Sequence, residues 1–230
     1  MSFVEVQQVS YRKGGKEIFK NLNFNLEKGR IIALLGENGS GKTTIMRLLS
    51  GLALNWKGKI TVDNAELSYK TKNQVAFLVD LKDFSKEFTV KQVLDFYRRF
   101  YADYSEKRAQ DLIVFMELDV NAKLKTLSKG QQEKVALVAT LACKAAIYLL
   151  DEPLSGIDLL TREKIIQSLL RWFEEDSLLL ITTHQMAEIE NIVDEVMILK
   201  DQEIVLHQSI EKLREERGLG LESLYREVLG

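Results

Sequence analysis

Short segments near the start of the chain alternate apolar and polar residues. Leu22, Phe24 and Leu26 lie two positions apart and would share one face of an extended strand. Because side chains along a strand point alternately to opposite faces, this period predicts half-buried strands of an antiparallel sheet. Residues 3–10 and 20–29 show the pattern, and residues 58–63 and 73–80 are further strand candidates.

Later strand candidates are apolar at nearly every position. Residues 30–35 read RIIALL, residues 145–153 read AAIYLLDEP, and residues 177–184 read SLLLITTH. Continuous apolar runs of this length are typical of strands that are buried on both faces, as in a parallel sheet. Residues 195–201 and 203–208 predict a closing hairpin.

Segments with a helical period lie between and after these strands. Thr89, Ser105 and Ser128 each precede such a segment and belong to the residue types that favour the N-cap position. Strands that alternate with helices predict an α/β fold with a mainly parallel sheet, covered on both faces. The helical segments are residues 42–52, 89–104, 105–119, 128–142 and 159–175, a short helix from residue 186, and a charged tail over 209–230 with a break at 218–220.

Composition narrows the class of protein only a little. The 230 residues carry a formal net charge of −2, so there is no general attraction toward nucleic acid or anionic lipid. The single cysteine, Cys143, excludes an intramolecular disulfide and fits a reducing compartment. No apolar run approaches the roughly 20 residues of a membrane span, and the N-terminus lacks a signal-peptide pattern. We expect a cytosolic protein in which Cys143 and His207 are structural.

The first candidate site is the segment GENGSGKT, which joins an apolar strand to a helix. It matches the pattern of a phosphate-binding loop, in which glycines let backbone N–H groups surround an anion at a helix N-terminus. Lys42 would reach the β- and γ-phosphates, and the Thr43 hydroxyl would ligate Mg²⁺. The expected nucleotide-binding residues here are Gly36, Glu37, Asn38, Gly39, Ser40, Gly41, Lys42, Thr43 and Thr44.

Polar residues end two of the buried strands. Asp151 and Glu152 follow the run AAIYLL, and His184 follows SLLLITT. An aspartate in this place assists Mg²⁺ binding, usually through water, and the next glutamate would orient and deprotonate an attacking water. His184 would contact the γ-phosphate and the same water. Lys42, Glu152 and His184 are therefore the expected catalytic residues.

A second phosphate-binding element lies in the segment TLSKGQQEKVAL. Ser128 would cap the helix, and Gly130 would allow close approach of the backbone to an anion. One chain with two phosphate-binding elements is explained if two chains face head to tail. Each nucleotide would then lie between the first element of one chain and the second element of the other. Tyr11 precedes the first loop and would stack on adenine, although an ordinary tyrosine at a strand edge is the alternative.

Together these segments resemble the nucleotide-binding subunit of an ABC transporter, and most of all separate-chain bacterial exporters. GENGSGKT is similar to the family's Walker A motif, LSKGQ to its signature, IYLLDEP to its Walker B motif, SGID to its D-loop, and His184 to its switch histidine. The resemblance covers nearly the whole chain. It implies ATP and Mg²⁺ as cofactors and a sandwich dimer, in which the signature residues Ser128, Gly130 and Gln131 and the D-loop residue Asp158 join the nucleotide sites.

The resemblance also implies a division of the fold. It predicts a RecA-like P-loop NTPase core, an N-terminal antiparallel β subdomain and an inserted α-helical subdomain within one ABC ATPase domain. The expected boundaries are about 1–30 and 58–75 for the β subdomain, 31–57, 76–84 and 144–208 for the core, about 85–143 for the helical subdomain, and 209–230 for a C-terminal tail.

One position departs from the family. Where the family has a proline–glutamine pair, the Q-loop, this chain has Val79 and Asp80. Asp80 still offers an oxygen toward Mg²⁺, but its side chain is shorter and charged. In the resembled family the adjacent region docks the membrane subunit, so we expect docking near residues 80–101. The segment FYRRFY within it mixes aromatic and basic residues, and a plain amphipathic helix is the alternative; nucleic acid is not expected.

These features predict an energy-coupling ATPase on the cytoplasmic face of the membrane, where a separate membrane-spanning partner would hold it. The ATPase would pair with a second ATPase chain, which we expect to be identical. The short spacing from Thr43 to Leu127 resembles that of separate-chain bacterial exporters, and this resemblance implies export, with peptides or drugs as the expected cargo. A soluble ABC-type ATPase acting on ribosomes or DNA is the alternative, but the second ATPase module and the long coiled-coil insertion are missing. A nucleotide kinase would not need LSKGQ or the strand-end histidine.

Overall fold

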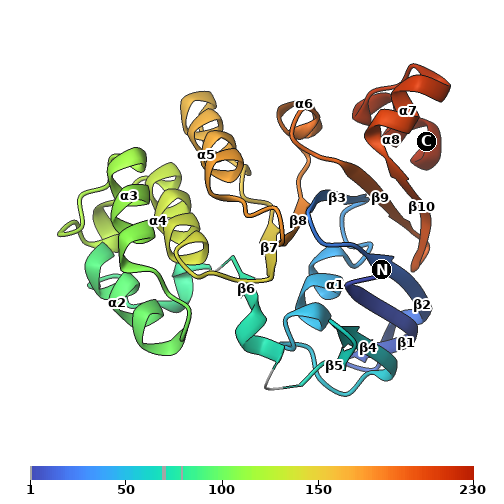
Figure 1. Ribbon diagram of the computed structural model, residues 1–230, viewed down its shortest axis with the longest axis horizontal. Coiled ribbons are helices and arrows are strands. Elements are labelled where there is room, and N and C mark those ends of the chain that lie inside the picture. Colours follow the sequence, from blue (N-terminus) through green and yellow to red (C-terminus); the bar gives the residue numbers. More distant parts are fainter. Residues whose placement is uncertain (1, 69–70, 79) are drawn as a thin grey trace.

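A computed structural model describes residues 2–68, 71–78 and 80–230 and shows two sheets with flanking helices (Figure 1). Among these residues the larger sheet has the strand order β10-β9-β3-β8-β7-β6. All its neighbouring strands pair in parallel except β10, which is antiparallel to β9 and forms the predicted hairpin. The strands are β3 (Arg30–Gly36), β6 (Val75–Phe77), β7 (Ile147–Asp151), β8 (Leu178–Thr182), β9 (Glu195–Lys200) and β10 (Glu203–Ser209).

The smaller sheet is antiparallel and has the order β2-β1-β4-β5. Gly14 and Gly15 form the turn between its first two strands with φ of 57° and 81°, a left-handed conformation that glycine adopts without strain. Leu22 and Leu26 are buried and Phe24 is half-buried, so the predicted shared face is confirmed. The strands are β1 (Val4–Lys13), β2 (Lys16–Leu26), β4 (Lys57–Val62) and β5 (Ala65–Glu66).

The helices begin where the caps were predicted. Thr89, Ser105 and Ser128 each accept a hydrogen bond from a backbone N–H in the first turn of their helix, and Thr89 and Ser128 form complete capping boxes. Gly218 ends the helix before the predicted break with φ of 63°. The helices are α1 (Lys42–Leu49), α2 (Val90–Phe100), α3 (Glu106–Met116), α4 (Lys129–Leu141), α5 (Leu159–Trp172), α6 (Met186–Ile189), α7 (Ile210–Arg217) and α8 (Leu221–Leu229), with 3₁₀ turns η1 (Thr71–Gln74), η2 (Leu81–Asp83) and η3 (Leu124–Thr126).

Strand β3 lies between two hydrophobic cores. Ile32 and Leu34 pack with α1 and the antiparallel sheet, whereas Ala33 and Leu35 face the core formed with α4, α5 and α6. Each fully buried Leu or Ile side chain contributes about 1.5–3 kcal/mol of apolar burial. Burial on both faces explains why this strand is apolar at nearly every position, as its sequence predicted.

Parallel strands present their carboxyl ends at the same edge of the sheet. The ends of β3, β7 and β8 are neighbours there because β8 pairs with both of the other strands. Helices α2, α3 and α4 gather to one side of the large sheet, and α7 and α8 lie at its other end (Figure 1). Within the described parts of the chain, no helix has both the length and the apolar character needed to cross a bilayer. The subdomain boundaries stay a prediction.

Candidate functional site

The loop between β3 and α1 wraps around the side chain of Lys42. This side chain is buried, and its Nζ donates hydrogen bonds to the Gly36 carbonyl at 2.7 Å and the Glu37 carbonyl at 3.0 Å. At Gly41, φ is 116° and an added Cβ would lie 2.6 Å from the Phe19 ring. Glycine is therefore required at this position for both its conformation and its size.

The cavity beside the loop has a volume of about 230 Å³. Burial lowers the pKa of the Lys42 ammonium, and the carboxylates of Glu152 and Asp151 oppose that shift. The Ser40 hydroxyl is buried and has no hydrogen-bond partner among the described residues. A buried cation and an unpaired buried hydroxyl at a helix N-terminus suit a polyanionic ligand such as a phosphate chain. The cavity is lined by Asn38, Gly39, Gly41, Lys42, Thr43, Thr44, Asp151 and Glu152.

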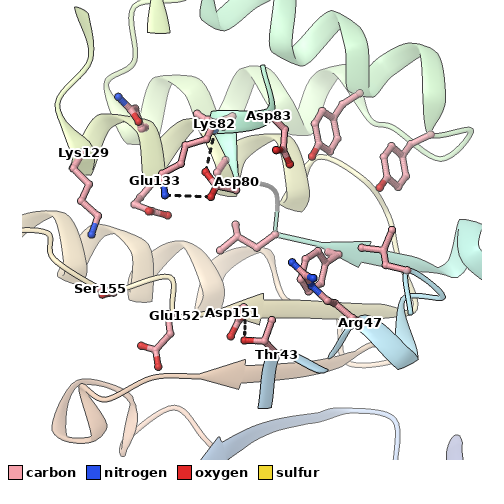
Figure 2. Close-up of a pocket in the computed structure, with 18 residues that line it drawn as sticks. Thr43, Arg47, Asp80, Lys82, Asp83, Lys129, Glu133, Asp151, Glu152 and Ser155 are labelled. Carbon is pink, nitrogen blue, oxygen red and sulfur yellow. Dashed lines mark hydrogen bonds and ion pairs between the residues drawn. The ribbon is translucent and has the colours of Figure 1, made fainter. Parts of the chain in front are cut away.

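Asp151 is held through both of its carboxylate oxygens. The Thr43 hydroxyl, on α1, donates to Asp151 Oδ2 at 2.6 Å (Figure 2). The Thr182 hydroxyl, at the end of β8, donates to Asp151 Oδ1 at 2.7 Å. Three elements therefore fix one carboxylate beside the phosphate loop. Thr43 and Asp151 were both expected to bind Mg²⁺, and their contact places them together, while the metal role itself stays a prediction.

Glu152 and His184 meet at the same edge of the sheet. His184 Nε2 lies 3.2 Å from Glu152 Oε1 and 2.9 Å from Asn38 Oδ1. Glu152 has φ of 53°, a left-handed conformation that is uncommon for residues other than glycine, and its N–H donates to the Thr182 carbonyl at 3.1 Å. Glu152 Oε1 is buried and, apart from this close histidine, has no hydrogen-bond partner in the described residues. Such local strain is often found in active sites.

The signature segment lies apart from this cavity in the same chain. Ser128 and Gln131 bond each other reciprocally, with Gln131 N–H donating to Ser128 Oγ at 3.2 Å and Ser128 N–H donating to Gln131 Oε1 at 2.8 Å. Asp158 caps α5 by accepting from Thr161 N–H at 3.0 Å. Neither these residues nor Gly130 line the cavity beside the phosphate loop. The predicted nucleotide-binding residues that do line this cavity are Asn38, Gly39, Gly41, Lys42, Thr43 and Thr44.

Asp80 does not join Thr43 and Asp151. Its Oδ1 accepts a hydrogen bond from Lys82 N–H at 3.0 Å, which caps η2, and its Oδ2 lies 3.3 Å from Lys82 Nζ. Figure 2 shows Asp80 on another wall of a larger cavity of about 790 Å³ that also reaches the Thr43–Asp151 pair. The short aspartate bonds its own backbone two residues on, as this residue type commonly does. Its role toward Mg²⁺ stays a prediction, and Val79 lies outside the described residues.

Tyr11 lies on β1, half-buried and in register with Phe19 of β2. The Phe19 ring is the group that closes against Gly41, so Tyr11 is one cross-strand neighbour away from the phosphate loop. This position is compatible with contact to a nucleotide base. The structure also packs Tyr11 against the core beneath the antiparallel sheet, so the predicted stacking on adenine stays a prediction.

Comparison with known proteins decides the family. Residues 19–155, more than half of the chain, match the family model described as ABC transporter. The chain belongs to the ABC transporter family. It is 32% identical over 216 residues to the ABC transporter ATP-binding protein YtrB of Bacillus subtilis (strain 168), covering 93% of this chain and 74% of that protein.

Two further matches bear on activity and direction. The aliphatic sulfonates import ATP-binding protein SsuB of Zymomonas mobilis is 33% identical over 217 residues, covering 91% of this chain and 88% of that protein. A dimeric post-hydrolysis structure of the ATP-binding cassette MJ0796 with ADP and Pi has a TM-score of 0.77 at 27% identity, covering 90% of this chain and 98% of that one. The chain is accordingly an ABC transporter ATP-binding subunit with a P-loop NTPase fold and an ATPase whose hydrolysis is coupled to transport.

The structure adds residues that the motifs of this ABC subunit did not reveal. Thr182 bonds Asp151 and the backbone of Glu152, and Phe19 closes the space beside Gly41. Thr182 lies two positions before the switch histidine, at the end of a strand that neighbours the strand ending in Asp151. Its position at a strand end is a sequence signal from which its closeness to Asp151 was predictable. Phe19 carried no comparable signal, because its contact with the loop depends on how the two sheets pack.

Proposed function

We propose that two copies of this chain enclose two ATP molecules, and that closing and opening of the pair drive a separate membrane-spanning partner. The separation of the two phosphate-binding elements carries this proposal. The cavity at the loop is lined by residues between Asn38 and Thr44 and by Asp151 and Glu152, whereas Ser128 and Gly130 lie at the start of α4 and do not line it. A second chain in head-to-tail orientation would bring its signature helix to this cavity. The dimeric arrangement of MJ0796 supports such a pairing.

The residues at the strand edge divide the work of hydrolysis. Lys42 and the loop N–H groups would bind the phosphate chain, and the Tyr11 ring would stack on the base. Glu152 would orient the attacking water and accept its proton, because its Oε1 is buried without a hydrogen-bond donor other than the nearby His184. His184 contacts both Asn38 and Glu152. It would hold the γ-phosphate and the attacking water in the correct positions relative to each other.

The donor set fits Mg²⁺. Thr43 Oγ1 and Asp151 Oδ2 are 2.6 Å apart at the cavity, and oxygen ligands of this kind suit a small hard cation that keeps several waters. Among the described residues no group of three or more His, Cys, Asp or Glu side chains is placed to hold a metal, so phosphate and water oxygens would complete the site. When bound, Mg²⁺ would neutralise charge on the phosphates. Thr182 would keep Asp151 oriented toward it.

The membrane partner would dock near residues 80–101. Phe96 and Phe100 on α2 are 42% and 68% exposed, and their rings lie 4.4 Å apart between centroids. This aromatic face adjoins the 790 Å³ cavity, which Tyr97 and Tyr101 help to line. The Arg98 guanidinium pairs with the Asp95 carboxylate at 3.0 Å. This pairing favours an apolar protein segment over nucleic acid as the partner that docks on the aromatic face.

The cytoplasmic face of the membrane is the proposed location, because ATP is supplied there and the docking partner spans the bilayer. Export is the proposed direction, with peptides or drugs as cargo, on the ground that the chain is compact between its Walker A and signature motifs. The match to SsuB, an import protein by its name, makes direction a separate test. Reconstituted vesicles with the ATPase outside would accumulate cargo on ATP addition if the complex exports, and would release it if the complex imports.

Co-purification tests the proposal directly. Membranes would be solubilised in mild detergent with an ATP analogue, and proteins bound to the tagged chain would be identified. We expect a stoichiometric polytopic membrane protein. Phe96→Glu with Phe100→Glu should abolish its recovery, whereas Val114→Glu, an equal change at a 77% exposed position on α3, should not. Recovery of ribosomal proteins or DNA-repair factors alone would instead support a soluble ABC-type ATPase.

A further inference from the structure

Arg162 joins the start of α5 to the segment that carries the switch histidine. Its NH1 donates to Gln185 Oε1 at 2.9 Å and lies 3.5 Å from Glu188 Oε1. Its side chain is only 21% exposed, and its backbone N–H donates to the Asp158 carbonyl at 3.1 Å, so it belongs to the first turn of α5. The guanidinium therefore ties a helix end to a loop that no sequence motif connects with it.

The loop side of this contact adjoins the active site. Gln185 follows His184 directly, and its N–H donates to the Thr183 hydroxyl at 2.9 Å. His184 contacts Glu152 and Asn38, as described above. Gln185 shares a peptide plane with His184, whose own N–H donates to Glu152 Oε2 at 3.3 Å, so Gln185 adjoins the backbone that holds the histidine beside Glu152.

The helix side of the contact adjoins the signature segment of the same chain. A Cβ on Gly130 would lie 3.2 Å from Thr161 Oγ1 and 3.5 Å from Asp158 Oδ2. A Cβ on Gly156 would overlap Lys129 Nζ, so the lysine ammonium rests against the SGID loop. The start of α4 and the start of α5 are thus in direct contact.

A continuous set of contacts therefore runs from the signature segment to the switch histidine. It passes from Gly130 to Thr161, through the first turn of α5 to Arg162, and from Arg162 to Gln185. Arg162 Nε is buried without a hydrogen-bond partner among the described residues. This donor is available to a partner in a second arrangement of the same segments.

We propose that Arg162 is a positioning residue that couples the two ATP sites. The inference rests on the proposed head-to-tail pair, in which the signature of each chain contacts the ATP held by the other. When the signature of one chain binds the ATP held by its partner, the start of α5 in that first chain is displaced. Through Arg162 this displacement changes the position of His184 in the first chain's own ATP site. Occupation of one site thereby sets the geometry of hydrolysis in the other.

The test is the dependence of hydrolysis on ATP concentration in the purified full chain. We expect a wild-type Hill coefficient well above 1, with 2 as the limit for two sites. Arg162→Gln should lower the coefficient to about 1 and kcat by roughly 10- to 100-fold, the range expected for a misplaced catalytic group. Nucleotide affinity of the monomer should change less than about twofold, because Arg162 does not line the cavity. Arg162→Lys, which keeps the charge, should retain part of the coupling.

Matched variants separate coupling from folding. Arg171→Gln removes the same charge from the exposed last turn of α5 and should behave as wild type. Gln185→Leu cuts the contact from the other side, so the test stands even if Arg162→Gln does not fold, and Gln185→Glu, which keeps an acceptor, should preserve cooperativity. A wild-type Hill coefficient and kcat in Arg162→Gln, or in Gln185→Leu if Arg162→Gln does not fold, would overturn the inference.

The failure of this inference is distinguishable from failure of the proposed function. Size-exclusion chromatography of Glu152→Gln at saturating ATP reports whether the pair forms at all. A dimer whose wild-type form hydrolyses ATP with a Hill coefficient of about 1 would refute coupling and leave the proposed pair intact. A chain that stays monomeric would refute both.

Discussion

The side chains of Thr43 and Asp151 meet at 2.6 Å, although 108 positions separate them in the chain. Thr43 lies in the first turn of α1, directly after the phosphate loop. Asp151 ends β7, which is separated from β3 in the sheet by β8. Thr182 completes the arrangement from the strand between them. The site is therefore assembled at the carboxyl edge of a parallel sheet from elements that are distant in sequence.

Thr182→Val should impair both stability and hydrolysis. It removes the donor to Asp151 Oδ1 without changing the side-chain volume, and a part-buried group left unpaired costs about 1 kcal/mol, the lower end of the range for buried groups. Thr140→Val is the matched control, because Thr140 is equally buried but bonds only the Ala136 carbonyl within α4. Denaturant unfolding and ATP turnover should show a turnover defect in the first variant only. Equal turnover in both would contradict the role of Thr182.

Glu152→Gln should bind ATP and accumulate as a dimer while hydrolysis falls at least about 100-fold. The amide has the shape of the carboxylate but cannot accept the proton of water, and general-base catalysis contributes roughly 10²–10⁴-fold. Phosphate release and size-exclusion chromatography with ATP would measure the two effects. A variant that is monomeric at saturating ATP and hydrolyses it at the wild-type rate would exclude this role.

Lys42→Ala should lose ATP binding while the rest of the fold persists. The ammonium is buried in the loop, and its removal leaves the Gly36 and Glu37 carbonyls without their donor and the phosphates without a cation. We expect affinity to fall at least about tenfold, the equivalent of 1.4 kcal/mol. Fluorescent-nucleotide titration would measure it, with Lys57→Ala on the exposed start of β4 as the control. Unchanged affinity would remove the assignment of the phosphate loop.

Gly41→Ala should be more harmful than Gly39→Ala. Both glycines have positive φ, but a Cβ at Gly41 would lie 2.6 Å from the Phe19 ring, whereas a Cβ at Gly39 meets nothing within 4 Å. We expect a loss of about 2–4 kcal/mol at Gly41 and about 1 kcal/mol at Gly39. Thermal unfolding would rank the two. Phe19→Leu should reduce the loss at Gly41, and no such rescue would show that the backbone conformation alone decides the effect.

Stability should depend on pH through Glu195. His207 Nε2 lies 2.7 Å from Glu195 Oε2, and this hydrogen bond lowers the pKa of Glu195 against the opposing effect of burial. A carboxylate whose pKa is lowered by folding stabilises the protein above its unfolded pKa of about 4.3, and the contribution is lost as pH falls through the lower folded value.

Glu195→Gln should therefore be less stable than wild type by up to about 1 kcal/mol near neutral pH. The difference should shrink below about pH 4.3, when the wild-type carboxylate also becomes neutral. Urea unfolding of both proteins across this range would measure it. A difference that grows as the pH falls would show that the hydrogen bond to the Glu195 carboxylate is not its source.

Contiguous residues determined the family, the phosphate loop and the helix starts. Gly36 to Thr43 encode a loop by their spacing, and Thr89, Ser105 and Ser128 encode helix starts by bonding N–H groups within three residues. These features depend on short-range geometry, which the order of residues specifies directly. The buried strands were predictable for a similar reason, because burial on both faces requires an apolar residue at almost every position.

Only the tertiary structure decided which distant groups meet. The placement of β3 between β8 and β9 brings Thr43, Asp151 and Thr182 to one edge, and the packing of the two sheets places Phe19 against Gly41. The contact of Arg162 with Gln185 likewise depends on how α5 lies beside α6. Asp80 shows how far a motif position can predict a contact. Its place in the motif predicted a role at Mg²⁺, whereas in the structure its short side chain caps η2. Long-range pairings follow from the packing of whole elements, and no local pattern of residues encodes that packing.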